Sequence, residues 1–398
     1  MSRVTAQYDA YPYPERDPAE ERKRLITGSP SHPLEIDHFL FGGARDWSRP
    51  LRALVAGGGT GDALIQLAQV LTSAGRPYEI TYVDLSGAAR EIAEARAAAR
   101  GLSGIRFVTG SLLEAPALGP FDYIDCCGVL HHLPEPQAGF DALAASLAPG
   151  GGIGLMVYAP FGRSGVYPLQ EAFGTVLTGP PGDRLHRARA ILERIPDTHP
   201  FKRNALLGDH RASDAGFYDL LLHSQDRPFR IDELLAALDR AGLGMTGSPQ
   251  AHLYDPVPIL GEEAVPGGLD PAARMRVAEA LRGTIRTHVL YAAHSLEGRV
   301  AQPGPGAVPH LKGMSGARLA HHARRHGVVP VSHEGERFEI AVPALAARAF
   351  ARIDGRRSLR EIAAAVRSDW MEFAPVWAGV SRAMTGHGLM YYSRLLVT

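Results

Sequence analysis

At 398 residues the chain is longer than one ordinary domain, so we expect two, each large enough to bury a hydrophobic core. Its 42 basic and 42 acidic residues balance, which disfavours a nucleic acid or an anionic membrane surface as a general partner. The only cysteines are the adjacent Cys126 and Cys127, which excludes a disulfide framework, and we see neither a leader nor an apolar run of roughly 18 residues, so we expect a soluble cytoplasmic protein.

Residues 1–50 precede the first predicted strand and begin with an arm rich in tyrosine and proline, including Tyr8, Tyr11 and Tyr13. The prolines disfavour a helix interior here. The tyrosines can pack the arm onto the following domain, which is the interpretation we favour. Alternatively, the arm can close over a ligand pocket as a lid and bring phenol hydroxyls close to it.

The segment LRALVAGGGTGD, residues 51–62, carries the strongest local signal. Its almost continuously apolar start predicts a strand of a parallel sheet that is covered on both faces. The glycines that follow open the backbone to a ligand, and ALIQLAQVLTSAG then has the apolar spacing of a helix ending at Gly75. Strand, glycine turn and helix are the first unit of a doubly wound nucleotide-type fold.

The residues after the turn discriminate between ligands. A dinucleotide turn, G-x-G-x-x-G, places pyrophosphate at the helix N-terminus, but the third dinucleotide position is Asp62, whose carboxylate would repel it. The next predicted strand, EITYVD, ends at Asp84, whose carboxylate can accept hydrogen bonds from both hydroxyls of a ribose.

Gly57, Gly59 and Gly61 give G-x-G-x-G, and with Asp84 they resemble the donor-binding site of class I S-adenosylmethionine-dependent methyltransferases. The resemblance implies an α/β fold with a doubly wound, seven-stranded Rossmann-like sheet, and S-adenosylmethionine as methyl donor. Family members usually carry an acid two residues before the first glycine, where this chain has Val55, so the group that holds the methionine end of the donor is left open. The implied cofactor-binding residues are Gly57, Gly58, Gly59, Gly61, Asp84, Leu85, Ser111, Leu112 and Cys127.

Further along, SGAAREIAEARAAAR predicts a helix, and strands are expected over 105–108 and 121–127. The segment GVLHHLPEP after the fourth strand resembles small-molecule members of the family. Its His131 and His132 invite a metal or general-base interpretation, but we favour bonding to loop backbone. Cys126 and Cys127 are interpreted as small strand-end residues rather than nucleophiles, and the absence of motifs typical of base methylation disfavours a nucleic-acid acceptor.

GIGLMVYA predicts the fifth strand, with Tyr158 near its carboxyl end and so at the edge where ligands bind, although packing against a helix explains it equally well. We interpret residues 166–227 as a helical insertion that helps to build the acceptor site. Within it, His210 or His223 can take a proton from the acceptor, and solvated helix faces and caps are the alternative. Asp219 and His223 share a helical face, but the pattern is too loose for a metal site, and we predict none.

Prolines and glycines between residues 256 and 268 indicate a boundary, so we assign residues 51–255 to the methyltransferase-like domain and 256–398 to a second domain. This second domain should contain helices over DPAARMRVAEALRGT, MSGARLAHHARRHG and SLREIAAAV, the last with a capping box of Ser358 and Glu361. The pattern of helices and short strands resembles a small winged-helix module such as the regulatory domains of some methyltransferases. Its basic helix is interpreted as a solvated face rather than a nucleic-acid site.

The resemblance implies methyl transfer from S-adenosylmethionine to an oxygen, nitrogen or carbon atom of an unidentified acceptor. We favour a small-molecule acceptor. The alternatives are a protein acceptor, with lysine as the methylated residue, and a non-catalytic S-adenosylmethionine sensor.

Overall fold

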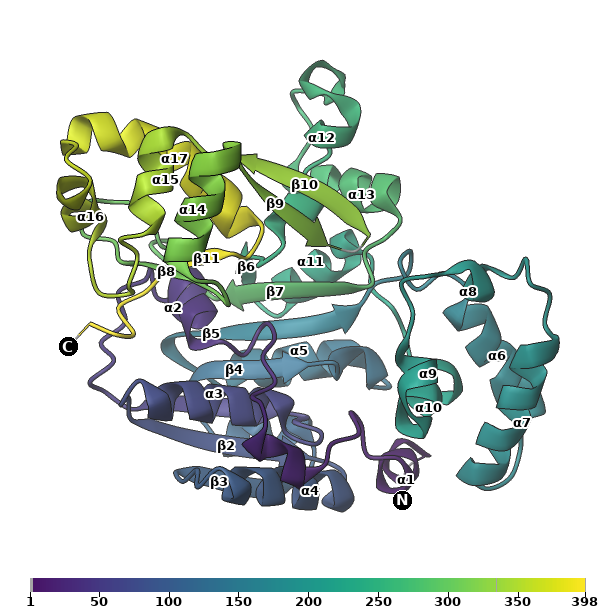
Figure 1. Ribbon diagram of the computed structural model, residues 1–398. Coiled ribbons are helices and arrows are strands. Elements are labelled where there is room, and N and C mark those ends of the chain that lie inside the picture. Colours follow the sequence, from purple (N-terminus) through teal and green to yellow (C-terminus); the bar gives the residue numbers. More distant parts are fainter. Residues whose placement is uncertain (1–2, 334, 398) are drawn as a thin grey trace.

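The computed structural model describes residues 3–333 and 335–397 and is organised around one seven-stranded sheet (Figure 1). The strand order is β3-β2-β1-β4-β5-β7-β6, and β7 runs antiparallel to both of its neighbours, whereas the other pairs are parallel. This order and the single reversed strand confirm the predicted doubly wound Rossmann-like fold. The strands are β1 (Leu51–Ala56), β2 (Tyr78–Asp84), β3 (Ile105–Thr109), β4 (Phe121–Cys127), β5 (Leu147–Tyr158), β6 (Gly244–Gly247) and β7 (Thr287–Ala293).

Helices cover both faces of this sheet, as the uninterrupted apolar sequence of β1 requires. Leu54 of β1 packs into the core with η2, α5 and α11, whereas its neighbour Val55 packs into the core with α2 and α3. The alternation follows from the two-residue period of a strand. The covering elements are α2 (Pro33–Leu40), α3 (Asp62–Ser73), α4 (Gly87–Ala99), η2 (Leu112–Ala117), α5 (Pro136–Ala145), α11 (Ile231–Arg240) and α13 (Pro271–Arg282).

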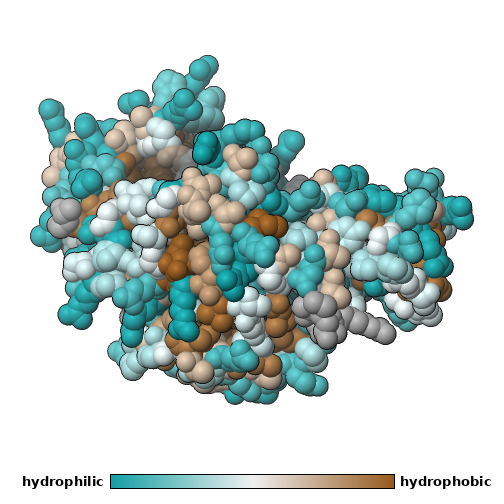
Figure 2. Space-filling view, turned by 90° about the horizontal axis from the view of Figure 1, so that it is seen from below, coloured by the Kyte–Doolittle hydropathy of each residue, from teal (hydrophilic) through white to brown (hydrophobic). Residues whose placement is uncertain are grey.

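The insertion projects from the side of the sheet as a lobe of helices, with a mostly hydrophilic surface at the right of Figure 2. It has an apolar core of its own, formed by side chains such as Leu169, Phe173 and Leu221. The helices are α6 (Val166–Val176), α7 (Pro181–Arg194), α8 (Pro200–Arg203), α9 (Asp209–Ala212) and α10 (Asp214–Leu222). The expected helical insertion over 166–227 is therefore present.

The expected domain boundary at residue 255 is wrong, because β7 lies beyond it and completes the sheet between β5 and β6. The helix α13, which we assigned to the second domain, packs beside α11 through the buried Glu279, whose carboxylate accepts the N–H of Ile231 at 2.9 Å. Proline and glycine marked a loop here, but the strand after that loop returns to the first domain. The second unit begins after Ala293.

The C-terminal unit has a separate apolar core that contains Phe350, Phe373 and Trp377. The capping box of Ser358 and Glu361 is confirmed at the start of α16. The winged-helix arrangement stays a prediction. The elements after Ala293 are β8 (Pro309–Leu311), α14 (Gly316–His326), β9 (Val328–His333), β10 (Glu336–Ala341), α15 (Ala344–Phe350), α16 (Leu359–Ala365), α17 (Trp370–Gly386) and β11 (Met390–Tyr392).

The remaining elements are short. They are α1 (Arg3–Ala10), η1 (Pro18–Arg22), η3 (Leu130–His132), η4 (Ala251–Tyr254), α12 (Val257–Leu260) and η5 (Glu262–Ala264). The tyrosine–proline arm begins with the helix α1, which corrects our expectation of a non-helical segment. The helix can form because it ends at Ala10, before the first proline. Within the described residues, no helix is long and apolar enough to cross a membrane.

The two units meet at the buried Asp37 of α2. Its carboxylate accepts hydrogen bonds from the indole of Trp47 (3.0 Å), the backbone N–H of Arg45 (3.0 Å), and the hydroxyl of Ser393 (2.6 Å) and N–H of Arg394 (3.1 Å) just after β11. One side chain therefore joins the first domain to the C-terminal end of the described chain.

Replacing Asp37 by alanine is expected to lower the free energy of unfolding by about 3 kcal/mol or more, because several buried donors lose their acceptor together. Urea denaturation followed by circular dichroism measures the change. Asp46→Ala, on an exposed residue of the same segment, is the matched control. Equal midpoints for the two variants would contradict the role of Asp37.

Candidate functional site

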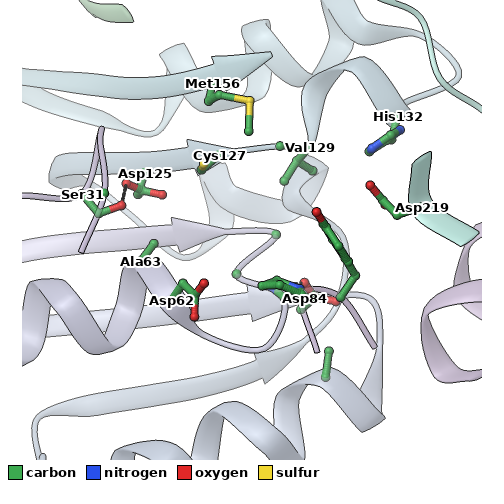
Figure 3. Close-up of a pocket in the computed structure, with 18 of the residues that line it drawn as sticks. Ser31, Asp62, Ala63, Asp84, Asp125, Cys127, Val129, His132, Met156 and Asp219 are labelled. Atoms are coloured by element: carbon green, nitrogen blue, oxygen red, sulfur yellow. Dashed lines mark hydrogen bonds between the residues drawn. The ribbon is translucent and has the colours of Figure 1, made fainter. Parts of the chain in front are cut away.

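A cavity of about 490 Å³ opens at the carboxyl ends of β1, β2, β4 and β5, where ligands bind in sheets of this kind. Figure 3 shows side chains from these strands and from the flanking segments pointing into it. Its walls include most of the predicted cofactor-binding residues: Gly57, Gly58, Gly59, Asp84, Leu85, Ser111, Leu112 and Cys127. Gly61 does not line the cavity.

The glycine turn is constrained by its protein neighbours. A side chain at Gly58 would come within 2.3 Å of the ring of Tyr82, and one at Gly59 would come within 2.7 Å of the carbonyl oxygen of Tyr13. Gly61 has φ +99°, and its added Cβ would meet Ala93 of α4 at 3.0 Å. The first two glycines thus let backbone line the cavity, while Gly61 allows α3 and α4 to approach.

Asp84 at the end of β2 is bound to the glycine turn. Its carboxylate accepts the N–H of Gly59 at 2.8 Å and the N–H of Ser86 at 2.8 Å. Burial raises the pKa of Asp84, and these two backbone bonds act in the opposite direction. Because each carboxylate oxygen has two acceptor sites, both oxygens keep capacity for a ligand hydroxyl.

Asp62 is neutralised by two arginines, which weakens our argument from charge repulsion. Arg16 of the N-terminal arm binds its carboxylate at 2.6 Å, and the buried Arg96 of α4 binds it at 2.8 Å. Arg96 and Arg100 also bind the buried Glu21, so a row of charges fastens the arm to α4. The carboxylate at position 62 does not act on the cavity as an uncompensated negative charge.

The tyrosine–proline arm covers the glycine turn. Thr60 donates a hydrogen bond to the carbonyl oxygen of Pro14 at 2.6 Å, and the side chains of Tyr8 and Tyr13 line the cavity. Only Tyr11 follows the packing interpretation we favoured, since its ring stacks on that of Tyr218 with centroids 5.0 Å apart. The arm both packs on the domain and covers the cavity.

Tyr158 lines the cavity as predicted, and its hydroxyl donates to Asp219 of the insertion at 3.0 Å. Burial raises the pKa of Tyr158 well above its usual value, and the negative charge of Asp219 raises it further. Tyr158 therefore stays protonated and serves as a hydrogen-bond donor. Tyr8 donates to the other oxygen of Asp219 at 3.2 Å.

His223 lies next to Asp219, and both of its ring nitrogens take part in hydrogen bonds. The N–H of Gln225 donates to Nδ1 at 3.1 Å, which places the ring proton on Nε2, facing the hydroxyl of Tyr8 at 3.1 Å. Burial also lowers the pKa of His223 well below its usual value. With no free lone pair in this arrangement, His223 is poorly placed to take a proton.

His132 has the complementary bonding. Its Nδ1 lies 2.9 Å from the carbonyl oxygen of Gln225, so this nitrogen carries the proton and Nε2 keeps its lone pair. The ring lines the cavity and stacks on His223, with centroids 3.7 Å apart. Figure 3 shows His132 and Asp219 close together at one end of the cavity. The backbone bond that we expected exists, and it orients a candidate base.

His210 is not brought to this site. It packs against Phe201, with ring centroids 4.8 Å apart, and lines a different cavity on the insertion. Sequence reasoning assigned no role to Asp125. It considered Tyr8 only as part of a lid, set the general-base interpretation of His132 aside in favour of backbone bonding, and noted Asp219 only for sharing a helical face with His223. For His132, the signal was its position just after the fourth strand, at the carboxyl edge of the sheet.

Two groups of potential metal ligands lie beside the cavity: His132, Asp219 and His223, and His131, His132 and Asp226. In the first group, His223 has no free lone pair and Asp219 already accepts from two phenols. In the second, the carboxylate of Asp226 lies 3.5 Å from Arg163, a cation that already balances its charge. The bonding of the first group and the charge balance of the second disfavour a metal ion, although both nitrogens of His131 have no hydrogen-bond partner within the part of the chain that the structure describes. A metal-free site stays our prediction.

Comparison with known proteins agrees with this geometry. Residues 54–153 match the sequence family described as "Methyltransferase domain". An uncharacterized protein of Synechococcus sp. is 33% identical over 267 residues, which cover 65% of this chain and 62% of that protein. The structure of PKMT2 from Rickettsia typhi in complex with AdoHcy superposes over 93% of this chain and 77% of that chain, with a TM-score of 0.64 and 14% identity. The structure of PKMT2 described without AdoHcy gives a TM-score of 0.62 over the same shares.

Proposed function

We propose that this chain, which carries a class I S-adenosylmethionine-dependent methyltransferase domain, binds S-adenosylmethionine in the cavity and transfers its methyl group to an acceptor held beside Tyr158 and His132. The observation that carries the proposal is the joint placement of the glycine turn and Asp84 at one wall of the cavity. Backbone without side chains and a buried carboxylate with spare acceptor sites suit an adenosyl group with its ribose hydroxyls.

The residues that line the cavity fit that donor. Asp84 would accept from the ribose hydroxyls, and Leu85, Leu112 and Val129 line the cavity next to it with apolar surface suited to an adenine ring. When bound, S-adenosylmethionine supplies a methyl group on a positively charged sulfur, which is already a strong electrophile. The protein then has to align the acceptor, exclude water and remove a proton.

The proton would go to Nε2 of His132. Its Nδ1–H is held by the carbonyl oxygen of Gln225, and Asp219 lies close enough to stabilise the imidazolium that forms. Tyr8 and Tyr158 hold Asp219 in place through both of its oxygens. This arrangement suits an acceptor whose oxygen or nitrogen loses a proton during transfer.

The covered cavity supports a small acceptor or a single side chain, because the donor alone would occupy most of about 490 Å³. A small molecule is our first candidate. Protein lysine is the second, since the carboxylates of Asp209 and Asp219 line the cavity and would attract an ammonium group. The likeness to PKMT2 shows a shared fold and does not decide between them.

Isothermal titration of the purified protein with S-adenosylmethionine, AdoHcy and NAD tests the proposal. We expect saturable one-site binding of the first two and none of NAD. Retention of NAD without binding of either adenosyl ligand would overturn it.

Incubation with methyl-labelled S-adenosylmethionine and cell extract then locates the acceptor. Label in the low-molecular-weight fraction favours the first candidate, and label in protein favours the second. Binding without any transfer would indicate a sensor that does not catalyse.

A further inference from the structure

The neighbour of Val55 in the sheet is an acid. Val55, which stands where an acid is usual, pairs in parallel register with Asp125 of β4. Register neighbours in adjacent strands point to the same face and lie about 5 Å apart. The carboxylate of Asp125 in β4 therefore lies on the same face of the sheet as Val55 and at the same register position, one strand away from β1.

Asp125 is buried, with 1% of its surface exposed, and it lines the cavity together with Ser31 and Cys127. Ser31 donates to its Oδ2 at 2.6 Å and Tyr123 donates to the same oxygen at 3.0 Å. Figure 3 shows the Ser31–Asp125 pair at the end of the cavity opposite His132. No hydrogen bond from the described residues reaches Oδ1.

This carboxylate also has no ion-pair partner among the described residues. Its burial raises its pKa to about 6, and the bonds from Ser31 and Tyr123 only partly oppose that effect. A buried acid with one free oxygen on a ligand cavity is costly unless a cation completes it. The other acid at this end of the cavity, Asp62, cannot play the same part, because Arg16 and Arg96 already bind it.

We propose that Oδ1 of Asp125 binds the α-ammonium group of the methionine portion of S-adenosylmethionine, in place of the acid that is missing at position 55. Ser31 and Tyr123 hold the carboxylate so that its free oxygen faces the ligand. This assignment rests on the proposed function and extends it from the adenosyl half of the cavity to the amino-acid half.

The test is a double-mutant cycle that combines one substitution in the protein with the removal of one group from the ligand. Asp125→Asn keeps the shape of the side chain and removes its charge, and the deaminated analogue of AdoHcy lacks the ammonium group. In the wild-type protein, AdoHcy should bind about tenfold to 100-fold more tightly than its deaminated analogue, the range expected for a charged hydrogen bond. In Asp125→Asn this preference should fall to less than about threefold, which is the coupling expected of a direct contact.

Methylthioadenosine, which has the adenosyl half but no amino acid, controls for damage to the cavity. Its affinity should change by less than about twofold in Asp125→Asn, whereas it should be lost in Asp84→Ala. An unchanged preference for the ammonium group in Asp125→Asn would overturn the assignment, and so would equal losses for AdoHcy and methylthioadenosine. If the wild-type protein binds none of these ligands, the proposed function itself fails.

Discussion

Replacing Asp84 by alanine is expected to lower the affinity for S-adenosylmethionine by at least about 100-fold, to the point where calorimetry detects no binding. Two losses combine in this variant. The ribose hydroxyls lose their charged acceptor, and the N–H groups of Gly59 and Ser86 lose the carboxylate that fixes the turn. AdoHcy should be affected to the same degree, because it has the same ribose.

Glu79→Ala is the matched control for Asp84→Ala, because Glu79 is an exposed acid on the same strand. It should bind both ligands with wild-type affinity. Circular dichroism and melting curves show whether each variant is folded. Tight binding by a folded Asp84→Ala protein would refute the assignment of ribose recognition, while leaving the methyltransferase fold itself untouched.

Replacing His132 by glutamine is expected to lower the turnover number by about 10²-fold to 10⁴-fold, the usual contribution of a positioned base, with little change in donor affinity. Glutamine can keep a hydrogen bond to the carbonyl oxygen of Gln225, but it cannot take up a proton at the position of Nε2. The rate of label transfer to the acceptor fraction measures the effect.

Two further histidine variants make the result specific. His186→Gln, on an exposed position of α7, is the control and should transfer methyl groups at the wild-type rate. His210→Gln separates the two hypotheses about the base, because His210 lines a different cavity. A loss of turnover in His210→Gln as large as in His132→Gln would favour the sequence-based prediction over the geometry.

Local sequence was enough for the first half of the site. The apolar run of β1, its glycine turn and the position of Asp84 at the end of β2 predicted the fold class and one wall of the cavity, because each depends on residues close together in the chain. Strand order at the carboxyl edge then places Asp84 beside the turn, since parallel strands end at the same side of a sheet.

Local sequence failed where a residue's role depends on partners far along the chain. Gln225 orients His132 from 93 residues away, and Ser31 binds Asp125 from 94 residues away. The short spacing between Asp219 and His223 predicted only a shared helical face. In the structure, both side chains bind the hydroxyl of Tyr8 from the N-terminal arm, and no spacing within the insertion could reveal this contact.

The sequence by itself determined that this protein has a doubly wound sheet with a glycine turn and an acid at the end of the next strand, and the resemblance of these residues to class I methyltransferases implied an adenosyl ligand. Periodicity and turn chemistry are local properties, and one strand and its turn suffice to display them. Only the tertiary structure decided that the sheet continues to Ala293, that His132 rather than His210 faces the cavity, and that Asp125 lies beside Val55. These facts depend on which strands become neighbours and in what register, and packing sets that register between segments that are distant in the chain.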